Sequence, residues 1–355
     1  MIRVGLVGAG NCASSLIQGK YYFQKHKDML GIINTNLGQY TVDDIEFVCA
    51  FDIDKRKVGQ DLSRAIFSAP NNATLFSDVP NLGVTVLKGR VLDGVAHHMR
   101  ETFLINEDQP GVNVAEELVR AKTDILINYL PVGSKEATEY YAQECIKAKV
   151  AFINAIPEFI CSNDSWEKRF IDAGIPCAGD DIKSQVGATI VNRVLTRLIY
   201  ERGCEIENMY QLNIGGNTDF MNMIEESRLI SKRISKTQSV LSQVKPEATF
   251  PNVKIGPSEH VPHLRDTKVC YINIQGRQFA GLPFEIDLKL KVEDSPNSAG
   301  VMLDVIRLLK IAKDNGLKGN IPAINAFAFK SPSIQYSDSI TNNMVQLFLK
   351  EYTTL

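Results

Sequence analysis

Short apolar runs alternate along the first half of the chain with stretches in which apolar residues recur at helical spacing. The apolar runs predict strands at residues 2–7, 45–51, 123–130 and 150–154. Before the last of these strands, a stretch with helical spacing ends at Ala148 and begins after Ser134, a residue type that favours the N-cap position. Strands that alternate with helices in this way predict a parallel, doubly wound α/β sheet.

The pattern changes after about residue 203. Residues 284–292 alternate strictly between apolar and charged side chains, which indicates a strand with one buried face, as in an antiparallel sheet. Residues 206–214 and 269–275 also predict strands, and helical spacing returns at 298–315. We therefore expect a second sheet that is open and mainly antiparallel, with one face available to another subunit.

A glycine-rich turn follows the first predicted strand. Gly8, Gly10 and Ala13 form the pattern G-x-G-x-x-A, in which the glycines permit a tight turn and the close approach of a pyrophosphate. Asp52 stands at the end of the second strand, where a carboxylate binds the ribose of NAD and disfavours NADP. An insertion at residues 20–41 makes the spacing to Asp52 longer than the usual ~20 residues. These residues predict a dinucleotide site; the alternative is a strand-to-helix turn in a domain without a ligand.

The length of the chain supports two domains, since 355 residues are about twice the ~150 residues of an average domain. We expect residues 1–203 and the returning helices of 298–355 to form an NAD-binding Rossmann domain around the doubly wound sheet. Residues 204–297 are then expected to form a second α+β domain that carries catalysis and oligomerisation.

Composition and charge argue against several classes of partner. Lys and Arg number 39 against 41 Asp and Glu, a net charge of −2, so the chain has no overall positive field for nucleic acid. Hydrophobic residues make up 44% of the chain, but no apolar run reaches the ~18 residues of a membrane span, and no signal peptide is recognised. Seven scattered cysteines without a C-x-x-C pair indicate reduced thiols, and we expect a cytoplasmic protein. His260 and His263 lack the helical H-E-x-x-H pattern, so no metal site is expected.

Polar and charged residues gather where predicted strands end or helices begin. Asp181 and Ser184 precede a stretch with helical spacing, where they can cap the helix or bind a ligand. Asp219 lies in the segment 215–222, which follows a strand and contains two glycines. Local structure alone explains a single residue of this kind, but two adjacent carboxylates beside Lys183 exceed what a cap requires and favour a ligand.

Four lysines stand in unusual surroundings. Lys232 and Lys236 are four residues apart and share one face if their segment is helical, while Lys268 lies in a charged segment and Lys330 ends an apolar run. One interpretation is that all four are exposed to solvent, as most lysines are. If they instead converge in a closed pocket, burial and mutual repulsion lower their pKa values, which makes proton donors and acceptors that also hold a phosphate.

Five of these segments occur in an order that a known family shares. They are G-D-D-I-K-S at 179–184, G-N-T-D at 216–219, S-K-R-I-S-K at 231–236, E-D-S at 293–295 and P-A-I-N-A at 322–326. Together they resemble the inositol-3-phosphate synthase (myo-inositol-1-phosphate synthase) family, in its shorter prokaryotic form. The resemblance implies an isomerisation without net redox change. Glucose 6-phosphate is oxidised at C5 by NAD, enolised, cyclised by an intramolecular aldol step and reduced to 1D-myo-inositol 3-phosphate, the committed step of inositol and inositol phospholipid biosynthesis.

The resemblance also implies which residues form the site. The catalytic residues would be Lys232, Lys236, Lys268, Lys330 and Asp219. Lys232 would relay the proton of the C5 hydroxyl, and Lys236 would stabilise the enolate and the aldolate. Lys268 and Lys330 would hold the phosphate and share proton transfer. The cofactor contacts would be Gly8, Gly10, Asn11, Cys12, Ala13, Asp52, Leu130, Pro131, Asp181, Ser184, Asp266, Asp294 and Ser295.

The family further implies a homotetramer and an ammonium, potassium or divalent cation near the cofactor or substrate. This chain departs from the eukaryotic branch, which has a longer phosphate loop than Gly10–Ala13, and its residues 185–187 change the spacing after Ser184. Two other functions stay open from the residues alone. One is an ordinary NAD-dependent dehydrogenase with net NADH formation, and the other is a non-catalytic NAD-binding protein.

Overall fold

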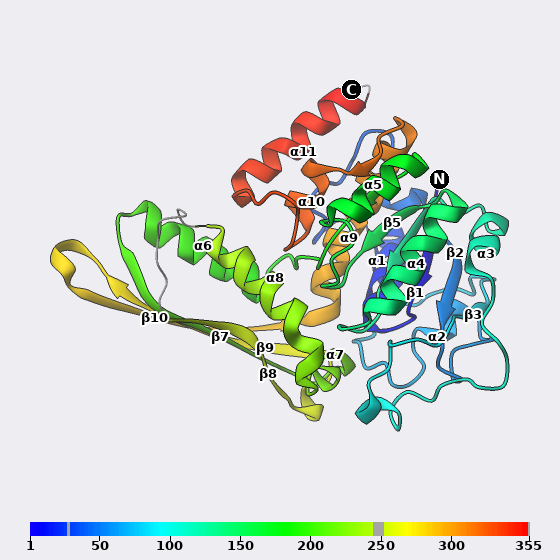
Figure 1. The fold of residues 1–355 in the computed structure, drawn as a ribbon, viewed down its shortest axis with the longest axis horizontal. Helices are drawn as coiled ribbons and strands as arrows, with labels where there is room; N and C mark the ends of the chain where they lie inside the picture. The colour runs from blue at the N-terminus through cyan, green and yellow to red at the C-terminus, as the bar shows by residue number, and fades with distance from the viewer. Residues whose placement is uncertain (27–28, 244–251, 354–355) are drawn as a thin grey trace.

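The computed structural model describes residues 1–26, 29–243 and 252–353. Its framework consists of a seven-stranded parallel sheet and a four-stranded sheet that extends away from it (Figure 1). The strands of the parallel sheet, in spatial order, are β3 (Val86–Lys88), β2 (Ile45–Asp52), β1 (Ile2–Val7), β4 (Ile125–Asn128), β5 (Ala151–Asn154), β6 (Pro176–Ala178) and β11 (Gly319–Asn320). The strand order reverses at β1, and ligands of doubly wound sheets bind beside the carboxyl ends of the strands at such a point.

Helices cover both faces of the parallel sheet. Those on one face are α1 (Asn11–Lys25), α9 (Asp294–Asp314) and α10 (Pro322–Ala328), and those on the other are α3 (Val114–Arg120), α4 (Lys135–Ala148) and α5 (Asp164–Ala173). In β4, Ile125 and Ile127 pack on the first face and Leu126 on the second. Burial on both faces explains why these strands appear in the sequence as continuous apolar runs. Two further helices, α2 (Leu62–Ala65) and α11 (Asp338–Tyr352), complete this region.

The start of α4 agrees with the prediction in position but differs from it in its cap. Ser134 occupies the N-cap position, yet its hydroxyl donates to the carbonyl of Pro131 and makes no capping bond. The carboxylate of Asp93 accepts instead from the N–H groups of Glu136 at 2.8 Å and Ala137 at 2.9 Å. A cap supplied by a residue distant in the sequence satisfies the same N–H groups, but no local pattern predicts it.

The second sheet has the order β10 (Pro283–Glu293), β9 (Thr267–Arg277), β7 (Glu205–Gly215) and β8 (Asn252–His260). β7 pairs in parallel with β8, and the other two pairs are antiparallel. α6 (Ala188–Glu201) and α8 (Ile230–Leu241) lie on one face, with the short α7 (Thr218–Asn222) at the end nearer the parallel sheet (Figure 1). The expectation of an open, mainly antiparallel sheet is confirmed.

The helical spacing after Ser184 comes from Val186, Ile190, Val194 and Leu198, and this apolar stripe is not the buried face of α6. Val194 and Leu198 are 53% and 50% exposed, whereas Asn192, Arg193 and Thr196 are fully buried. These polar side chains can be buried because each has a hydrogen-bond partner: Asn192 donates to Gln211 of β7, Arg193 donates to Ser239 of α8, and Thr196 donates to Asn192 within α6. α6 packs in one cluster with β7, β8 and β9 of the second sheet, although the sequence assigned it to the first domain.

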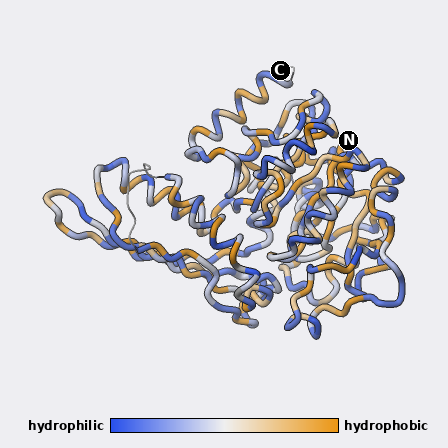
Figure 2. Tube along the Cα trace, viewed as in Figure 1, coloured by the Kyte–Doolittle hydropathy of each residue, from blue (hydrophilic) through white to orange (hydrophobic). Residues whose placement is uncertain are grey.

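One boundary near the second sheet also differs from the expectation. α9 begins at Asp294, directly after β10, and not at residue 298, so the E-D-S segment forms the junction between the two elements. Along β10 hydrophilic and hydrophobic residues alternate, while hydrophobic segments are concentrated around the parallel sheet (Figure 2). In the described ranges, no helix has the length and apolar character needed to cross a membrane.

Candidate active site

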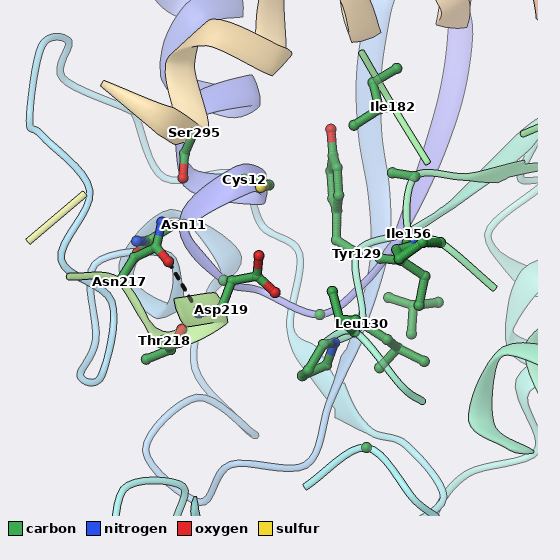
Figure 3. Close-up of a pocket in the computed structure, with 18 of the residues that line it drawn as sticks. Asn11, Cys12, Tyr129, Leu130, Ile156, Ile182, Asn217, Thr218, Asp219 and Ser295 are labelled. Carbon is green, nitrogen blue, oxygen red and sulfur yellow. Dashed lines mark hydrogen bonds between the residues drawn. The ribbon is translucent and has the colours of Figure 1, made fainter. Parts of the chain in front are cut away.

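A cavity of about 250 Å³ lies between the carboxyl ends of the parallel strands and the near end of the second sheet. All five predicted catalytic residues line it, and so do all but two of the predicted cofactor residues. These are Gly8, Gly10, Asn11, Cys12, Asp52, Leu130, Pro131, Asp181, Ser184, Asp219, Lys232, Lys236, Lys268, Asp294, Ser295 and Lys330. In Figure 3, Asn217, Thr218 and Asp219 lie across this space from Tyr129, Ile156 and Ile182.

The glycine turn after β1 forms one wall of the cavity. Gly8 has a φ of 88°, and a Cβ at this position would lie 2.9 Å from the carbonyl oxygen of Tyr129. A Cβ on Gly10 would meet no atom within 4 Å, so the space above its backbone is open. Gly10 is the N-cap of α1 without a capping side chain among the described residues, which leaves N–H groups of the first turn available to an anion. Ala13 is fully buried and packs in the core, behind the cavity wall.

The carboxylate of Asp52 supports this turn from the end of β2. Its Oδ2 accepts from the N–H of Ala9 at 2.8 Å, and its Oδ1 accepts from the N–H groups of Ile53 and Asp54 at 2.7 and 2.9 Å. Sequence reasoning missed Lys57, which is 1% exposed and lines the cavity. Its Nζ donates to the carbonyl of Ala9 at 3.0 Å and lies 3.9 Å from Asp52 Oδ2. The turn is therefore held from two sides before any ligand arrives.

Three of the four lysines each pair with a carboxylate. Lys232 Nζ donates to Asp219 Oδ2 at 2.6 Å, Lys330 Nζ donates to Asp181 Oδ1 at 2.6 Å, and Lys268 Nζ donates to Asp294 Oδ1. Of the three carboxylates, Asp181 follows β6, Asp219 lies in α7 and Asp294 begins α9. The fold thus brings residues from six separate stretches of the chain to one place, with opposite charges adjacent.

Lys236 is the exception among the four lysines. Within the described ranges no hydrogen bond or ion pair to its ammonium group is present, and the residue is only 7% exposed. Burial, followed by the nearby ammonium groups of Lys232, Lys268 and Lys330, lowers the pKa of Lys236 to about 7, while Asp181 acts in the opposite direction. A lysine with this pKa exchanges protons near neutral pH, which an ordinary lysine does not.

The ion-paired lysines respond differently to burial. Burial alone lowers the pKa of Lys268, but the carboxylate of Asp294 outweighs it, and the pKa is raised above the ordinary value. At Lys330 burial prevails over the attraction of Asp181, so its pKa is lowered. Lys268 is accordingly the more firmly protonated of the two, which suits a group that binds a phosphate.

Asp181 connects two of the lysine-bearing segments. Besides Lys330, its carboxylate accepts from the hydroxyl of Ser235 in α8 at 2.7 Å, and its carbonyl accepts from the backbone N–H of Lys330 at 2.8 Å. Although burial opposes ionisation, Lys330 and Lys232 lower the pKa of the Asp181 carboxyl. Its own contacts therefore hold α8 and Lys330 in place, and it also lines the cavity.

Asp266 lies behind the cavity wall. Its carboxylate accepts from Nδ2 of Asn11 at 3.1 Å, from Nδ2 of Asn217 at 3.0 Å and from the hydroxyl of Ser295 at 2.9 Å. Burial, and then the neighbouring carboxylate of Asp294, raises the pKa of Asp266 to about 6. It joins the starts of α1, α7 and α9 rather than lining the space that a cofactor would occupy.

Sequence reasoning also left Asn217 and Tyr129 out of the site. Asn217 caps α7, because its Oδ1 accepts from the N–H of Asp219 at 3.1 Å (Figure 3). Asparagine favours this position, so its residue type was a signal that the sequence carried. Tyr129 follows β4, and its buried hydroxyl has no hydrogen-bond partner within the described part of the chain. Nothing in the sequence marks it beyond its place at a strand end.

Histidines and cysteines contribute no metal centre in the part of the chain that the structure describes. No group of three or more His, Cys, Asp or Glu side chains there is arranged to hold an ion. His260 ends β8 and His263 lies in the short helical turn Pro262–Leu264, outside the cavity lining.

Comparison with known proteins agrees with this geometry. The family model for myo-inositol-1-phosphate synthase matches residues 187–295, which include α6, the second sheet and Ser295. The inositol-3-phosphate synthase of Mycolicibacterium smegmatis is 47% identical over 98% of this chain and 98% of its own.

Solved structures show the same fold over the whole chain. The crystal structure of a protein named Ari2 is 33% identical, with a TM-score of 0.80 over 99% of each chain. The inositol-3-phosphate synthase of Caenorhabditis elegans shares the fold at 16% identity, with a TM-score of 0.79 over 99% of this chain and 86% of its own. The fold class and the resemblance read from the sequence are both confirmed, and the chain belongs to the inositol-3-phosphate synthase family of enzymes.

Proposed function

We propose that this chain converts glucose 6-phosphate to 1D-myo-inositol 3-phosphate and re-forms its NAD+ in each cycle. The observation that supports this proposal most directly is Lys236, a buried lysine with a pKa of about 7 that stands among three ion-paired lysines. An enolisation followed by an aldol step needs one group that takes and returns protons and other groups that stay cationic.

The charge of the cavity supports a phosphorylated substrate. Six Lys or Arg side chains line it against four Asp, although the chain as a whole has a net charge of −2. A phosphate monoester carries nearly two negative charges at neutral pH and is attracted to such a site. We assign the phosphate to Lys268 and Lys330.

The glycine turn supports NAD as the cofactor. The open space above Gly10 and the uncapped first turn of α1 suit a pyrophosphate, and the carboxylate of Asp52, which lines the cavity, suits a ribose diol. Bound there, NAD would supply the hydride acceptor for C5 and later the hydride donor. The buried Lys57 and the half-buried Asn71, joined by a 2.9 Å hydrogen bond, would keep the turn in its binding conformation.

The proton transfers are assigned to Lys236 and to the pair of Lys232 and Asp219. In its neutral form Lys236 can take the proton from C6, and as a cation it can then stabilise the enolate and protonate the C1 oxygen after cyclisation. Lys232 and Asp219 would relay the C5 hydroxyl proton along their 2.6 Å hydrogen bond. At the end of the cycle these groups have the protonation they began with, as an isomerisation requires.

The test measures the formation of inositol phosphate and of NADH in the same reaction. Purified protein is incubated with glucose 6-phosphate, catalytic NAD+, ammonium and magnesium, while phosphorus NMR records inositol phosphate and absorbance records NADH. We expect product in large excess over NAD+, without accumulation of NADH, and no product from Lys236→Ala. NADH that accumulates without inositol phosphate would establish an ordinary dehydrogenase instead. No reaction of glucose 6-phosphate would refute the proposal.

We also propose a homotetramer. The exposed apolar stripe of α6, with Val194 and Leu198, lies on the second-sheet region and is unusual for a helix whose opposite face is polar and buried. Burial of this stripe against another subunit would explain its composition.

A further inference from the structure

Arg193 on α6 is a fully buried arginine that lies outside the cavity lining. Its guanidinium binds both oxygens of Asp338, with Nε to Oδ2 and Nη2 to Oδ1 at 3.2 Å each. Asp338 is the first residue of α11, and Lys183 Nζ lies 3.4 Å from its Oδ1. The planar guanidinium group of Arg193 is therefore anchored to the segment that follows Lys330.

The same guanidinium also holds the carboxyl end of α8. Nη1 donates to the carbonyl of Ser239 at 2.6 Å and to its hydroxyl at 3.1 Å. Ser239 lies three residues after Lys236 on α8, and carbonyls in the last turn of a helix need partners from outside the helix. A cation at this end also interacts favourably with the helix dipole.

On its other side Arg193 reaches the backbone near Lys330. Nη2 donates to the carbonyl of Tyr336 at 2.8 Å, and Nη1 lies 3.4 Å from Oε1 of Gln335. The amide of Gln335 in turn donates to the carbonyl of Lys330 at 2.6 Å. One side chain thus connects the helix that carries Lys236 with the segment that carries Lys330.

We propose that Arg193, held by Asp338, is a positioning residue that sets the separation between Lys236 on α8 and the segment that carries Lys330. The inference rests on the proposed function, in which Lys236 exchanges protons with the substrate. Arg193 touches no residue of the reaction and acts only through the placement of α8.

The groups around Lys236 explain why this separation matters. Lys232 on α8, Lys268 and Cys270 on β9, Lys330 after α10 and Asp181 after β6 all interact with it electrostatically. If α8 moves away from the segment after α10, Lys236 gains water and loses repulsion from Lys330. Both changes raise the pKa of Lys236 towards its ordinary value and leave it protonated at neutral pH.

Arg307 on α9 provides a matched control. It is also fully buried and pairs with a fully buried carboxylate, Asp304, and it donates to the carbonyls of Asn34 and Thr35 at 2.8 and 2.9 Å. None of these contacts involves a lysine of the cavity. Arg193→Lys and Arg307→Lys each keep one buried positive charge but lose the planar guanidinium group. The two variants therefore differ in whether that group is lost beside α8 or on α9.

The experiment measures Lys236 directly. Wild type, Arg193→Lys and Arg307→Lys are labelled with acetic anhydride between about pH 6 and about pH 10, and the Lys236 peptide is quantified by mass spectrometry, with the buried Lys57 as a check on global unfolding. We expect Arg193→Lys to raise the labelling pKa of Lys236 by about one unit and to lower kcat about tenfold at pH 6.5, with kcat near wild type at pH 9.5. Arg307→Lys should leave both unchanged.

The outcomes separate this inference from the proposed function. If Arg193→Lys and wild type share one labelling profile, the positioning role is wrong even if both are active. If wild type does not turn over glucose 6-phosphate, the proposed function is wrong, whatever the labelling shows. Should Arg193→Lys fail to fold, Asp338→Asn decides the matter. It keeps one acceptor oxygen and is expected to shift the profile in the same direction, and an unshifted profile would overturn the inference.

Discussion

Replacing Lys236 with Met should stabilise the protein while it abolishes turnover. Folding places this lysine where its pKa falls from an ordinary 10.5 to about 7. At about 1.4 kcal/mol for each pKa unit, this difference corresponds to about 5 kcal/mol of unfavourable free energy when the ammonium is buried at low pH. Methionine has a similar length, carries no charge and tolerates irregular packing, so Lys236→Met removes most of this cost.

The pH dependence of the effect has a definite sign. Between about pH 7 and 10.5 the unfolded chain keeps the proton that folded Lys236 has released, so wild-type stability from this group rises with pH. The stability that deprotonation of Lys236 contributes is fully present above the pKa of this lysine in the unfolded chain. It is lost as the pH falls through the pKa of Lys236 in the folded protein. Lys236→Met should therefore exceed wild type by a few kcal/mol at pH 6.5 and by about 1 kcal/mol or less at pH 10.

Guanidinium unfolding followed by circular dichroism, at several pH values, measures this difference. Lys57→Met is the matched control, because Lys57 is also buried but donates to Ala9 and Asn71, and its loss should destabilise the protein. A Lys236→Met variant that is no more stable than wild type at pH 6.5, with a difference independent of pH, would refute the assigned environment of Lys236.

Three further outcomes are expected. Lys268→Met should lose activity and about 3 kcal/mol of stability in urea unfolding, because the half-buried carboxylate of Asp294 loses its ion-pair partner; wild-type stability would contradict the ion pair. Asp52→Asn should weaken NAD binding about tenfold in calorimetry and reduce the preference for NAD over NADP. An unchanged preference for NAD would show that Asp52 does not bind the ribose. Leu198→Glu should lower the mass measured by light scattering without altering the circular dichroism spectrum, whereas an intact tetramer would exclude the α6 stripe from the interface.

The sequence alone was sufficient for features that depend on neighbouring residues. The glycine turn and the parallel strands follow from local periodicity and small residues, because such patterns reflect backbone geometry and burial over a few residues. The family motifs likewise led to the four lysines that line the cavity. For α6 the pattern predicted a helix but not which face is buried, since that depends on partners such as those of Arg193.

Tertiary structure alone decided the chemistry of individual groups. Asp266 and Asp294 were both predicted as cofactor contacts, yet Asp266 lies behind the wall of the cavity and Asp294, at the start of α9, lines it. Lys236 and Lys232 share one helix, but only Lys232 finds a carboxylate, Asp219. The pKa of Lys236 depends on burial and on charges from elements far apart in the sequence, and Coulomb interactions act through space, so only the folded chain determines it.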